Sequence, residues 1–302
     1  MIISVVIRTL NEETYLSELL EKILKQNIEN DDKVEIIIVD SGSSDRTLEI
    51  ANKFNCRITN IKKEDFTFGR SLNQGAEFSN GDILVFISGH CVPINENWMK
   101  NLISPIKYNN SKYVYGRQEG RDSTKFSESK IFDKYFPQQT SLDQEGFFCN
   151  NANSALSRKI WEKYKFNEEL TGLEDLELAK RIYNDELKIS YIADASVYHI
   201  HDESWTQTKF RYERESLALQ SIMPEIQIHL LDLLRYIFSS IFSDGVAAFL
   251  EKKFFKEISS IVRFRIAQYL GSYKGNHYQR VLSKKKKENF FYPTKKIKDS
   301  LK

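Results

Sequence analysis

Two adjacent carboxylates, Glu174 and Asp175, are the residues of this sequence best suited to acid–base chemistry. They lie in TGLEDLELAKRIYND, shortly after Gly172 and at the start of a predicted helix. Adjacent carboxylates can raise the pKa of one of the pair, and a carboxylate with a raised pKa can accept a proton from a hydroxyl. Acidic residues in a first helical turn also favour the helix dipole without any catalytic role. This pattern predicts a general base or a structural helix start.

A third acidic residue, Asp40, ends the run VEIIIVD, whose aliphatic and β-branched residues predict a strand buried on both faces. A small polar turn follows at residues 41–44. A helix is predicted from about Asp45 to Phe54, with Ser44 or Asp45 as its N-cap. Open α/β sheets bind ligands at the carboxyl ends of their strands, so Asp40 is a predicted site residue by position.

Three histidines follow other predicted strands. His90 comes after the buried run DILVFIS and before Pro93, whereas His199 and His201 lie two residues apart in SYIADASVYHIHDESW. The last two share one face if that segment is extended. Imidazole can ligate a metal, and its protonated form can neutralise a phosphate. An ordinary pair of histidines at a strand end is an open alternative for His199 and His201.

The elements that must position these residues alternate along the chain. An N-terminal strand, IISVVIRT, precedes a helix whose apolar residues recur at helical spacing: Tyr15, Leu16, Leu19, Leu20, Ile23 and Leu24. The helix that carries the carboxylate pair is expected to face the core with Leu176, Ala179, Ile182 and Tyr183. This alternation predicts an α/β fold. Neither GxGxxG nor GxxxxGK[ST] is present, which argues against a dehydrogenase or a P-loop enzyme.

In this order the motifs resemble the family 2 glycosyltransferases, inverting enzymes with the GT-A fold. The resemblance covers about residues 1–220. It implies a Rossmann-like, mostly parallel central sheet flanked by helices, and a nucleotide-sugar donor linked to UDP, dTDP, GDP or CMP. It also implies a set of residues around the base, ribose and phosphates of the donor: Thr9, Asn11, Glu12, Asp40, Ser41, Arg70, Asn73, Ser88 and Gly89. For Arg70, a surface salt bridge is an open alternative.

For catalysis, the resemblance implies that Asp175 takes the proton of the acceptor hydroxyl and that Glu174 orients the acceptor or a loop. The segment GFFCNNANSALSRKIW is similar to the acceptor side of the family's site. Its amides would hydrogen-bond sugar hydroxyls beside two phenylalanines: Asn150, Asn151 and Asn153.

The chain departs from the family where most relatives carry an acidic DxD motif that binds Mn²⁺ or Mg²⁺. The aligned residues here are Ser88, Gly89 and His90. Three interpretations stay open: His90 ligates a metal, with His199 or His201; His90 offers a proton or positive charge to the leaving phosphate; or His90 only positions the chain. The second would suit a metal-independent enzyme with a CMP-linked donor, which has one phosphate to stabilise.

Charge is unevenly distributed along the 302 residues. Residues 271–302 contain ten Lys or Arg and two acidic residues, and the preceding 270 residues carry 34 basic against 40 acidic residues. The stretch from Ile226 to Ile266 is rich in Leu, Ile and Phe. We therefore expect a catalytic domain at 1–220, an amphipathic helical extension at 221–282 and a basic tail at 283–302. The extension either packs on the core or, with the tail, contacts an anionic membrane.

Location and partners follow from what the sequence lacks. No window reaches the 18 or so uncharged apolar residues of a membrane span, no basic stretch precedes the first strand, and three scattered cysteines fit a reducing compartment. We expect a cytoplasmic protein that can associate with the inner face of the membrane. The tail contains no recognisable nucleic-acid-binding module, so nucleic acid is not an expected partner.

The predicted activity is inverting transfer of a sugar to a hydroxyl of a growing surface polysaccharide or lipid-linked glycan. One alternative is a non-catalytic nucleotide- or sugar-binding protein with a decayed site, suggested by the missing DxD. Another is a nucleotidyltransferase, against which the absence of a Gly-rich basic loop after Thr9 argues.

Overall fold

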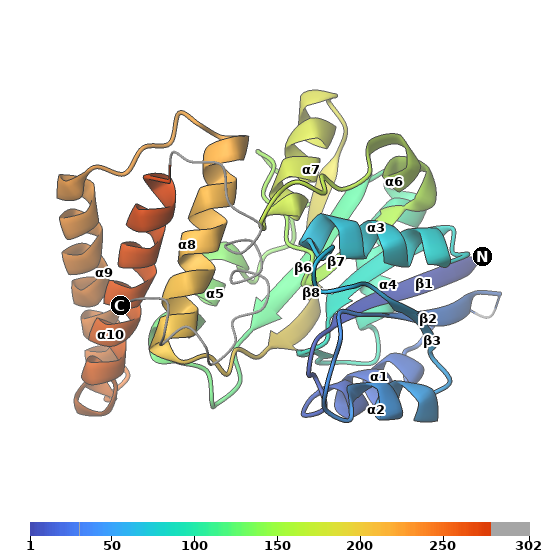
Figure 1. Cartoon of the computed structure of the whole chain (residues 1–302), viewed down its shortest axis with the longest axis horizontal. Coiled ribbons are helices and arrows are strands. Elements are labelled where there is room, and N and C mark those ends of the chain that lie inside the picture. The colour runs from blue at the N-terminus through green and yellow to red at the C-terminus, as the bar shows by residue number, and fades with distance from the viewer. Residues whose placement is uncertain (30, 279–302) are drawn as a thin grey trace. The chain divides into compact units, whose positions relative to one another are not determined.

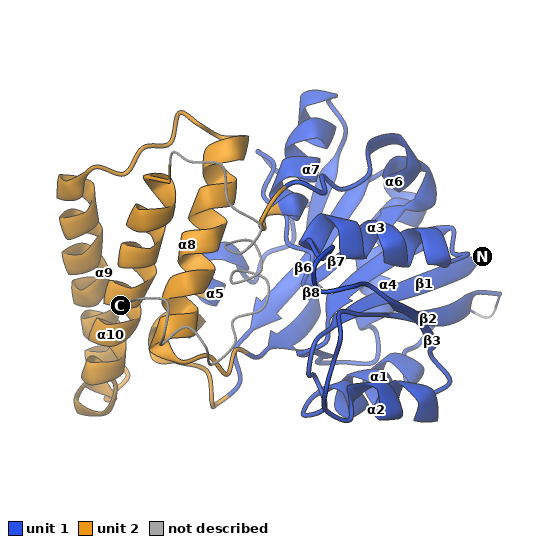
Figure 2. Ribbon diagram, in the orientation of Figure 1, with its two compact units in different colours: residues 1–121, 132–169, 174–200 blue, residues 122–131, 170–173, 201–302 orange. Residues whose placement is uncertain are grey.

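The structure is a computed structural model that describes residues 1–29 and 31–278 (Figure 1). The chain divides into two compact units (Figure 2). Unit 1 comprises residues 1–121, 132–169 and 174–200, and unit 2 comprises residues 122–131, 170–173 and those from His201 onward.

Unit 1 is built on one eight-stranded sheet with the order β3-β2-β1-β4-β7-β6-β8-β5. The strands are β1 (Ile2–Thr9), β2 (Lys33–Asp40), β3 (Arg57–Asn60), β4 (Ile83–Ser88), β5 (Cys91–Pro93), β6 (Tyr113–Glu119), β7 (Asn153–Ser157) and β8 (Ile189–His199). Strands β3, β2, β1 and β4 are parallel, and β7 runs antiparallel to β4 and β6. The predicted α/β fold with a mostly parallel sheet is confirmed. Strand β3 was not predicted, because RITN contains a single aliphatic residue.

Six helices of the described residues belong wholly to unit 1: α1 (Leu16–Leu24), α2 (Thr47–Lys53), α3 (Phe68–Phe78), α4 (Trp98–Tyr108), α6 (Arg158–Tyr164) and α7 (Glu174–Asn184). The predicted starts of two of them need correction. Helix α1 begins after Tyr15, and its last residue, Leu24, is exposed. Helix α2 begins at Thr47, because Asp45 accepts hydrogen bonds from the Thr47 N–H and the Glu13 N–H instead of capping directly.

Successive side chains of β1 alternate between two helical layers, as a strand buried on both faces requires. Ile3, Val5 and Ile7 belong to the hydrophobic core that also contains residues of α1 and α4. Val6 faces the other way, toward Gly75 of α3, where an added Cβ would clash with the Val6 side chain. Arg8 shares this even-numbered parity, so its side chain points toward the α3 layer.

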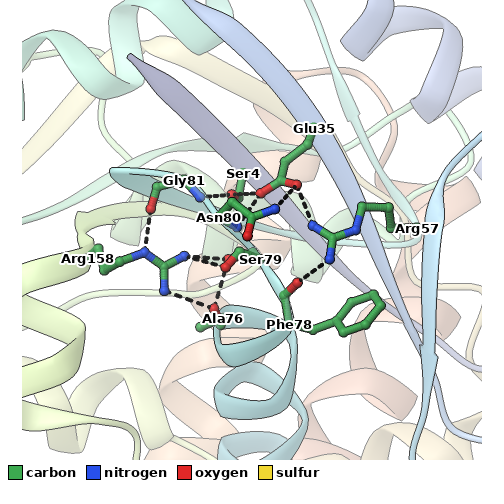
Figure 3. Close-up of polar contacts among 9 residues, drawn as sticks. All are labelled: Ser4, Glu35, Arg57, Ala76, Phe78, Ser79, Asn80, Gly81 and Arg158. Carbon is green, nitrogen blue, oxygen red and sulfur yellow. Dashed lines mark hydrogen bonds and ion pairs between the residues drawn. The ribbon is translucent and has the colours of Figure 1, made fainter.

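A polar network closes the sheet near the amino ends of its parallel strands (Figure 3). The Glu35 carboxylate accepts hydrogen bonds from Ser4 Oγ at 2.6 Å, Arg57 Nη1 at 2.6 Å and the Asn80 N–H at 2.5 Å. Arg158 donates to the Gly81 carbonyl at 2.6 Å. Burial acts to raise the pKa of Glu35, but these hydrogen bonds outweigh it and hold the pKa below its usual value. The network joins the connection between α3 and β4 to the sheet, which assigns this end a structural role.

Unit 2 is helical. It contains α8 (Trp205–Ile222), α9 (Leu230–Leu250), α10 (Phe254–Asn276) and the first six residues of α5 (Phe126–Tyr135). Helices α8 and α10 approach closely at Gly271 and Gly275, where an added Cβ would clash with the Lys209 and Glu213 carbonyls. The structure thus groups α8 with the C-terminal helices, whereas the sequence pattern placed residues 201–220 in the catalytic domain. The expected basic tail at 283–302 lies outside the described residues.

Candidate active site

The carboxylate pair begins α7, and both side chains are buried. The inward face of the helix consists of residues at helical spacing: Glu174, Asp175, Leu178, Ala179 and Ile182. Tyr183, which was expected to face the core, is exposed instead. Asp175 Oδ2 accepts a hydrogen bond from the Asn151 N–H, and Oδ1 accepts one from the Leu176 N–H, both at 2.8 Å. The pair is therefore held in a fixed position inside unit 1.

The surroundings of Asp175 favour its protonated form. Burial, followed by the neighbouring Glu174 carboxylate, raises the pKa of Asp175 to about 7. The two backbone hydrogen bonds and the charge of Arg8 act in the opposite direction. Tyr113 and Cys149 also face this carboxylate, and burial raises the pKa of both well above its usual value. A carboxylate that titrates near neutral pH can accept a proton during a reaction.

Arg8, at the end of β1, is a site residue that was not predicted. Its Nη1 atom lies 3.6 Å from Glu174 Oε1, and its Cζ lies 4.8 Å from the centroid of the Phe68 ring. Nη1 is buried and has no hydrogen-bond partner among the described residues. In the sheet register Arg8 is the partner of Ser88 at the end of β4. The available signal was a cation at the end of the otherwise aliphatic strand IISVVIRT.

Asp40 lies at the carboxyl end of β2 beside Thr9, as expected for two parallel neighbours. It is almost fully buried, and its carboxylate accepts hydrogen bonds from Thr9 Oγ1, the Gly42 N–H, the Ser43 N–H and Ser43 Oγ. Ser41 is buried too, and its hydroxyl donates to the Thr9 carbonyl. Gly42 has a φ of 94°, which favours glycine. These residues shape the turn after β2, and nucleotide contact by Thr9, Asp40 and Ser41 stays a prediction.

The loop after β1 hydrogen-bonds to the loop after β2 and to His90. Asn11 Oδ1 accepts a hydrogen bond from the Ser44 N–H at 2.8 Å. Glu12 Oε1 lies 2.8 Å from His90 Nδ1, so the carboxylate expected at the base or ribose contacts the imidazole instead. A Cβ on Gly89 would lie 2.8 Å from Glu12 Cγ, which is too close. Glu12 therefore orients His90, as an acceptor on Nδ1 does in many functional histidines.

His199 ends β8, and its ring stacks on that of His90 with centroids 5.2 Å apart. Its Nδ1 lies 2.6 Å from Gln118 Oε1. Strand β8 ends at His199, so the extended segment stops short of His201, and a shared role for the two histidines stays a prediction. His201 belongs to unit 2, where its Nδ1 lies 2.9 Å from Glu128 Oε1. Metal ligation by these histidines stays a prediction.

Asn73 and Arg70, expected near the donor, hold a neighbouring loop. The Asn73 side chain is buried and bonds to Trp161, to both backbone groups of Phe166 and to Glu168. Arg70 Nε donates to Glu168 Oε2 at 2.9 Å, the salt bridge that was the alternative for this residue. The Asn73 expectation is corrected, because all hydrogen-bonding groups of its amide are already used inside unit 1.

The three asparagines expected on the acceptor side differ in their burial. Asn153 is fully buried and bonds to Trp98 Nε1, the Arg117 carbonyl and the Ala195 carbonyl. Asn151 is buried, and its Oδ1 accepts from Tyr113 Oη at 2.5 Å and Ser154 Oγ at 2.8 Å. Asn150 is half-buried and accepts from Gln118 and the Ala152 N–H. The Asn151 and Asn153 side chains thus hydrogen-bond inside unit 1, and sugar contact by the asparagines stays a prediction.

Comparison with known proteins identifies the family of this chain. The family model described as glycosyl transferase family 2 matches residues 4–165, more than half of the chain. The chain belongs to glycosyltransferase family 2.

Among the similar proteins, the O-antigen chain rhamnosyltransferase RfbN of Salmonella typhimurium is 27% identical over 224 residues, which are 70% of this chain and 70% of that protein. The poly(ribitol-phosphate) β-N-acetylglucosaminyltransferase TarS of Staphylococcus aureus is 24% identical over 202 residues, which are 65% of this chain but 35% of that protein.

Solved structures of glycosyltransferases share the fold. The mannosyltransferase PcManGT of Pyrobaculum calidifontis, in complex with GDP-Man and Mn²⁺, superposes with a TM-score of 0.65 at 15% identity, covering 92% of this chain and 88% of that one. Residues 1–349 of TarS in complex with UDP superpose with a TM-score of 0.54 at 16% identity, covering 94% and 95%. The predicted family, GT-A fold and enzyme class are confirmed.

The residues that follow β4 are those predicted to take the place of the family's acidic motif. After β4 the chain presents a hydroxyl, a glycine and an imidazole: Ser88, Gly89 and His90. Hard divalent cations such as Mg²⁺ prefer carboxylate and other oxygen ligands. Ser88, Gly89 and His90 offer no carboxylate of their own, and the carboxylate beside them is that of Glu12, 2.8 Å from His90 Nδ1.

Proposed function

We propose that this glycosyltransferase moves a sugar from its nucleotide donor to an acceptor hydroxyl in a single displacement that inverts the anomeric centre. The observation that carries the proposal is the buried Asp175, whose raised pKa and fixed orientation suit a general base. Asp175 takes the proton of the hydroxyl while that oxygen attacks the anomeric carbon, and the bond from this carbon to the donor phosphate breaks. Glu174, beside Arg8, orients the pair.

The leaving phosphate needs positive charge around it. We propose that His90, oriented by Glu12, supplies that charge or a proton directly, because the residues after β4 offer no carboxylate of their own. The alternative is a metal held by imidazoles, with His90 joined by His199 or His201. A CMP-linked donor would suit the first arrangement, and UDP-, dTDP- and GDP-sugars stay candidates.

The acceptor we propose is a hydroxyl of a growing surface polysaccharide or lipid-linked glycan. Support comes from the names of the relatives, an O-antigen chain rhamnosyltransferase and a poly(ribitol-phosphate) N-acetylglucosaminyltransferase. Such acceptors fit an enzyme that works in the cytoplasm at the inner face of the membrane.

A nucleotide screen followed by a transfer assay tests the proposal. The protein is heated with UDP, dTDP, GDP or CMP, because a ligand at about 100 times its Kd stabilises the fold by about 2.7 kcal/mol. The nucleotide that raises the Tm defines which sugar donors to test with glycan acceptors. Transfer by the intact protein and its loss in Asp175→Asn support the proposal. Nucleotide binding without transfer or donor hydrolysis would favour a non-catalytic binding protein.

A further inference from the structure

One side of α9 carries large apolar side chains that are exposed to solvent and do not contribute to the core of unit 2. Four of its residues are spaced by 7, 4 and 7 positions and so align along one side of the helix: Leu231, Phe238, Phe242 and Phe249. We call these four residues the α9 face. The three phenylalanines are 68%, 74% and 69% exposed. Phe255, at the start of α10, is 95% exposed.

The opposite side of α9 is anchored within unit 2, which determines which side points outward. Asp244 is buried and forms two hydrogen bonds with Arg265 of α10, at 2.7 and 2.9 Å. Ser127 of α5 donates to the same carboxylate at 2.6 Å. Ala248 packs in an apolar cluster with Phe126 and Ile261. The α9 face is therefore a fixed outer surface of unit 2.

Exposed cations border the α9 face together with acids: Lys253 pairs with Glu251 at 2.9 Å, and Lys256 lies 3.7 Å from Glu257. Arg235 lies between Leu231 and Phe238 in the helix and is exposed, as are three lysines that flank Phe255 in sequence: Lys252, Lys253 and Lys256. The acids of α9 are used elsewhere, since Asp232 accepts a hydrogen bond from the His229 N–H and Asp244 binds Arg265. Exposed phenylalanines with Arg235 and Lys252 beside them fit the boundary between the headgroups and acyl chains of an anionic bilayer.

We propose that unit 2 docks on an anionic lipid surface through the α9 face, with α9 lying in the plane of the interface. This deepens the proposed location of the enzyme and rests on it. Among the described residues α9 is the one helix long and apolar enough to cross a membrane by length and composition, with a mean hydropathy of 1.4 over its best window. The buried bonds of Asp244 to α10 and α5 favour lying on the membrane over crossing it. An interface between two copies of this chain is the competing use of the same face, and light scattering distinguishes it.

Vesicle binding by the full chain, without substrate, tests this surface. Vesicles of phosphatidylcholine mixed with phosphatidylglycerol are compared with vesicles of phosphatidylcholine alone. The double variant Phe238→Gln/Phe242→Gln changes two exposed side chains and should lower partitioning onto the mixed vesicles by about tenfold or more. The matched control Leu24→Gln/Leu142→Gln changes two exposed leucines of unit 1 and should bind as the unchanged protein does. The charge variant Lys252→Glu/Lys256→Glu should weaken binding to the mixed vesicles alone.

Three results would overturn the docking surface. One is equal vesicle binding by the Phe238→Gln/Phe242→Gln variant and the unchanged protein. Another is binding that depends on residues 279–302 but not on the α9 face, which would make the tail the anchor. The third is a dimer in light scattering that dissociates in the same variant, with no vesicle binding by either protein. Because the assay contains no donor or acceptor, docking can fail while transfer to a soluble acceptor persists, so the two proposals are judged separately.

Discussion

Replacing Asp175 by asparagine should inactivate the enzyme and, at alkaline pH, stabilise its fold. Turnover is expected to fall by about a hundredfold to ten-thousandfold, because an amide keeps the shape of the side chain but cannot accept the proton of the acceptor. The gain in stability arises because the ionised carboxylate is buried beside Glu174. A residue that serves only as a helix start would show the pH-dependent gain in stability without the loss of turnover.

The size of this gain in stability follows from the pKa of Asp175 in the unfolded and folded states. The pKa of Asp175 rises from 3.8 to about 7 on folding, and at about 1.4 kcal/mol per pKa unit this corresponds to a cost of about 4 kcal/mol. The folded state binds the proton more tightly, so the cost grows as pH rises from about 4 and is complete above about pH 8. Asparagine removes this cost. Asparagine also places an NH2 group where one carboxylate oxygen accepts a hydrogen bond, because the Asn151 and Leu176 N–H groups donate to different oxygens of Asp175. The lost hydrogen bond costs about 1–3 kcal/mol.

The net expectation is a gain of about 1–3 kcal/mol in the free energy of unfolding at about pH 8, which turns into a loss of about 1–3 kcal/mol as pH is lowered toward 4, where only the hydrogen-bond cost remains. Urea unfolding at both pH values measures it, and a transfer assay measures the turnover. Asp143→Asn is the matched control, because Asp143 is an exposed carboxylate whose replacement should change neither quantity. Near-normal turnover, or lower stability at about pH 8 than the unchanged protein, would refute the reasoning.

Three further perturbations test the neighbours of Asp175 in the site. Arg8→Met should move the rising limb of the pH–turnover profile to higher pH by about one unit, because the Arg8 charge lowers the pKa of Asp175. Arg8→Lys keeps the charge and should move the limb less. An unchanged limb in Arg8→Met would show that Arg8 does not influence the pKa of Asp175. His90→Ala should depress turnover strongly with or without added Mn²⁺, and complete inactivation by EDTA that Mn²⁺ reverses would favour the imidazole-bound metal instead. Asp40→Ala should lower the free energy of unfolding by about 1–3 kcal/mol, because the buried donors of Thr9, Gly42 and Ser43 lose their acceptor, and should weaken nucleotide binding in calorimetry. Unchanged nucleotide affinity in that variant would mean that Asp40 only stabilises the turn after β2.

The strands and the carboxylate pair were predictable because their signals are local. Aliphatic runs that end in polar residues marked β1, β2 and β4, and helical spacing predicted the helix that begins with Glu174 and Asp175. Of the residues expected on its core side, Ala179 and Ile182 are buried, whereas Leu176 and Tyr183 are not. Strand β3 escaped prediction because four residues with one aliphatic side chain carry little pattern, and it forms by pairing with β2.

The roles of the asparagines and of Arg8 depend on contacts between distant segments. Asn73 and Asn153 have side chains that suit both sugar hydroxyls and buried backbone groups, and only the fold shows that Phe166 and Ala195 occupy them. Arg8 acquires its place because the sheet register sets it beside Ser88 and α7 brings Glu174 to it. The type and sequence spacing of such residues are compatible with several hydrogen-bond or ion-pair partners. The partner that the fold supplies determines whether the residue has a structural role or lies in the active site.

The anomeric configuration of the product tests the central claim most directly. Once the nucleotide screen has identified a donor, the sugar transferred by the unchanged protein is examined by NMR at its anomeric proton. Single displacement with Asp175 as base predicts a configuration opposite to that of the sugar in the donor. A product that retains the configuration of the donor would contradict the account, because retention requires a second displacement or a different path.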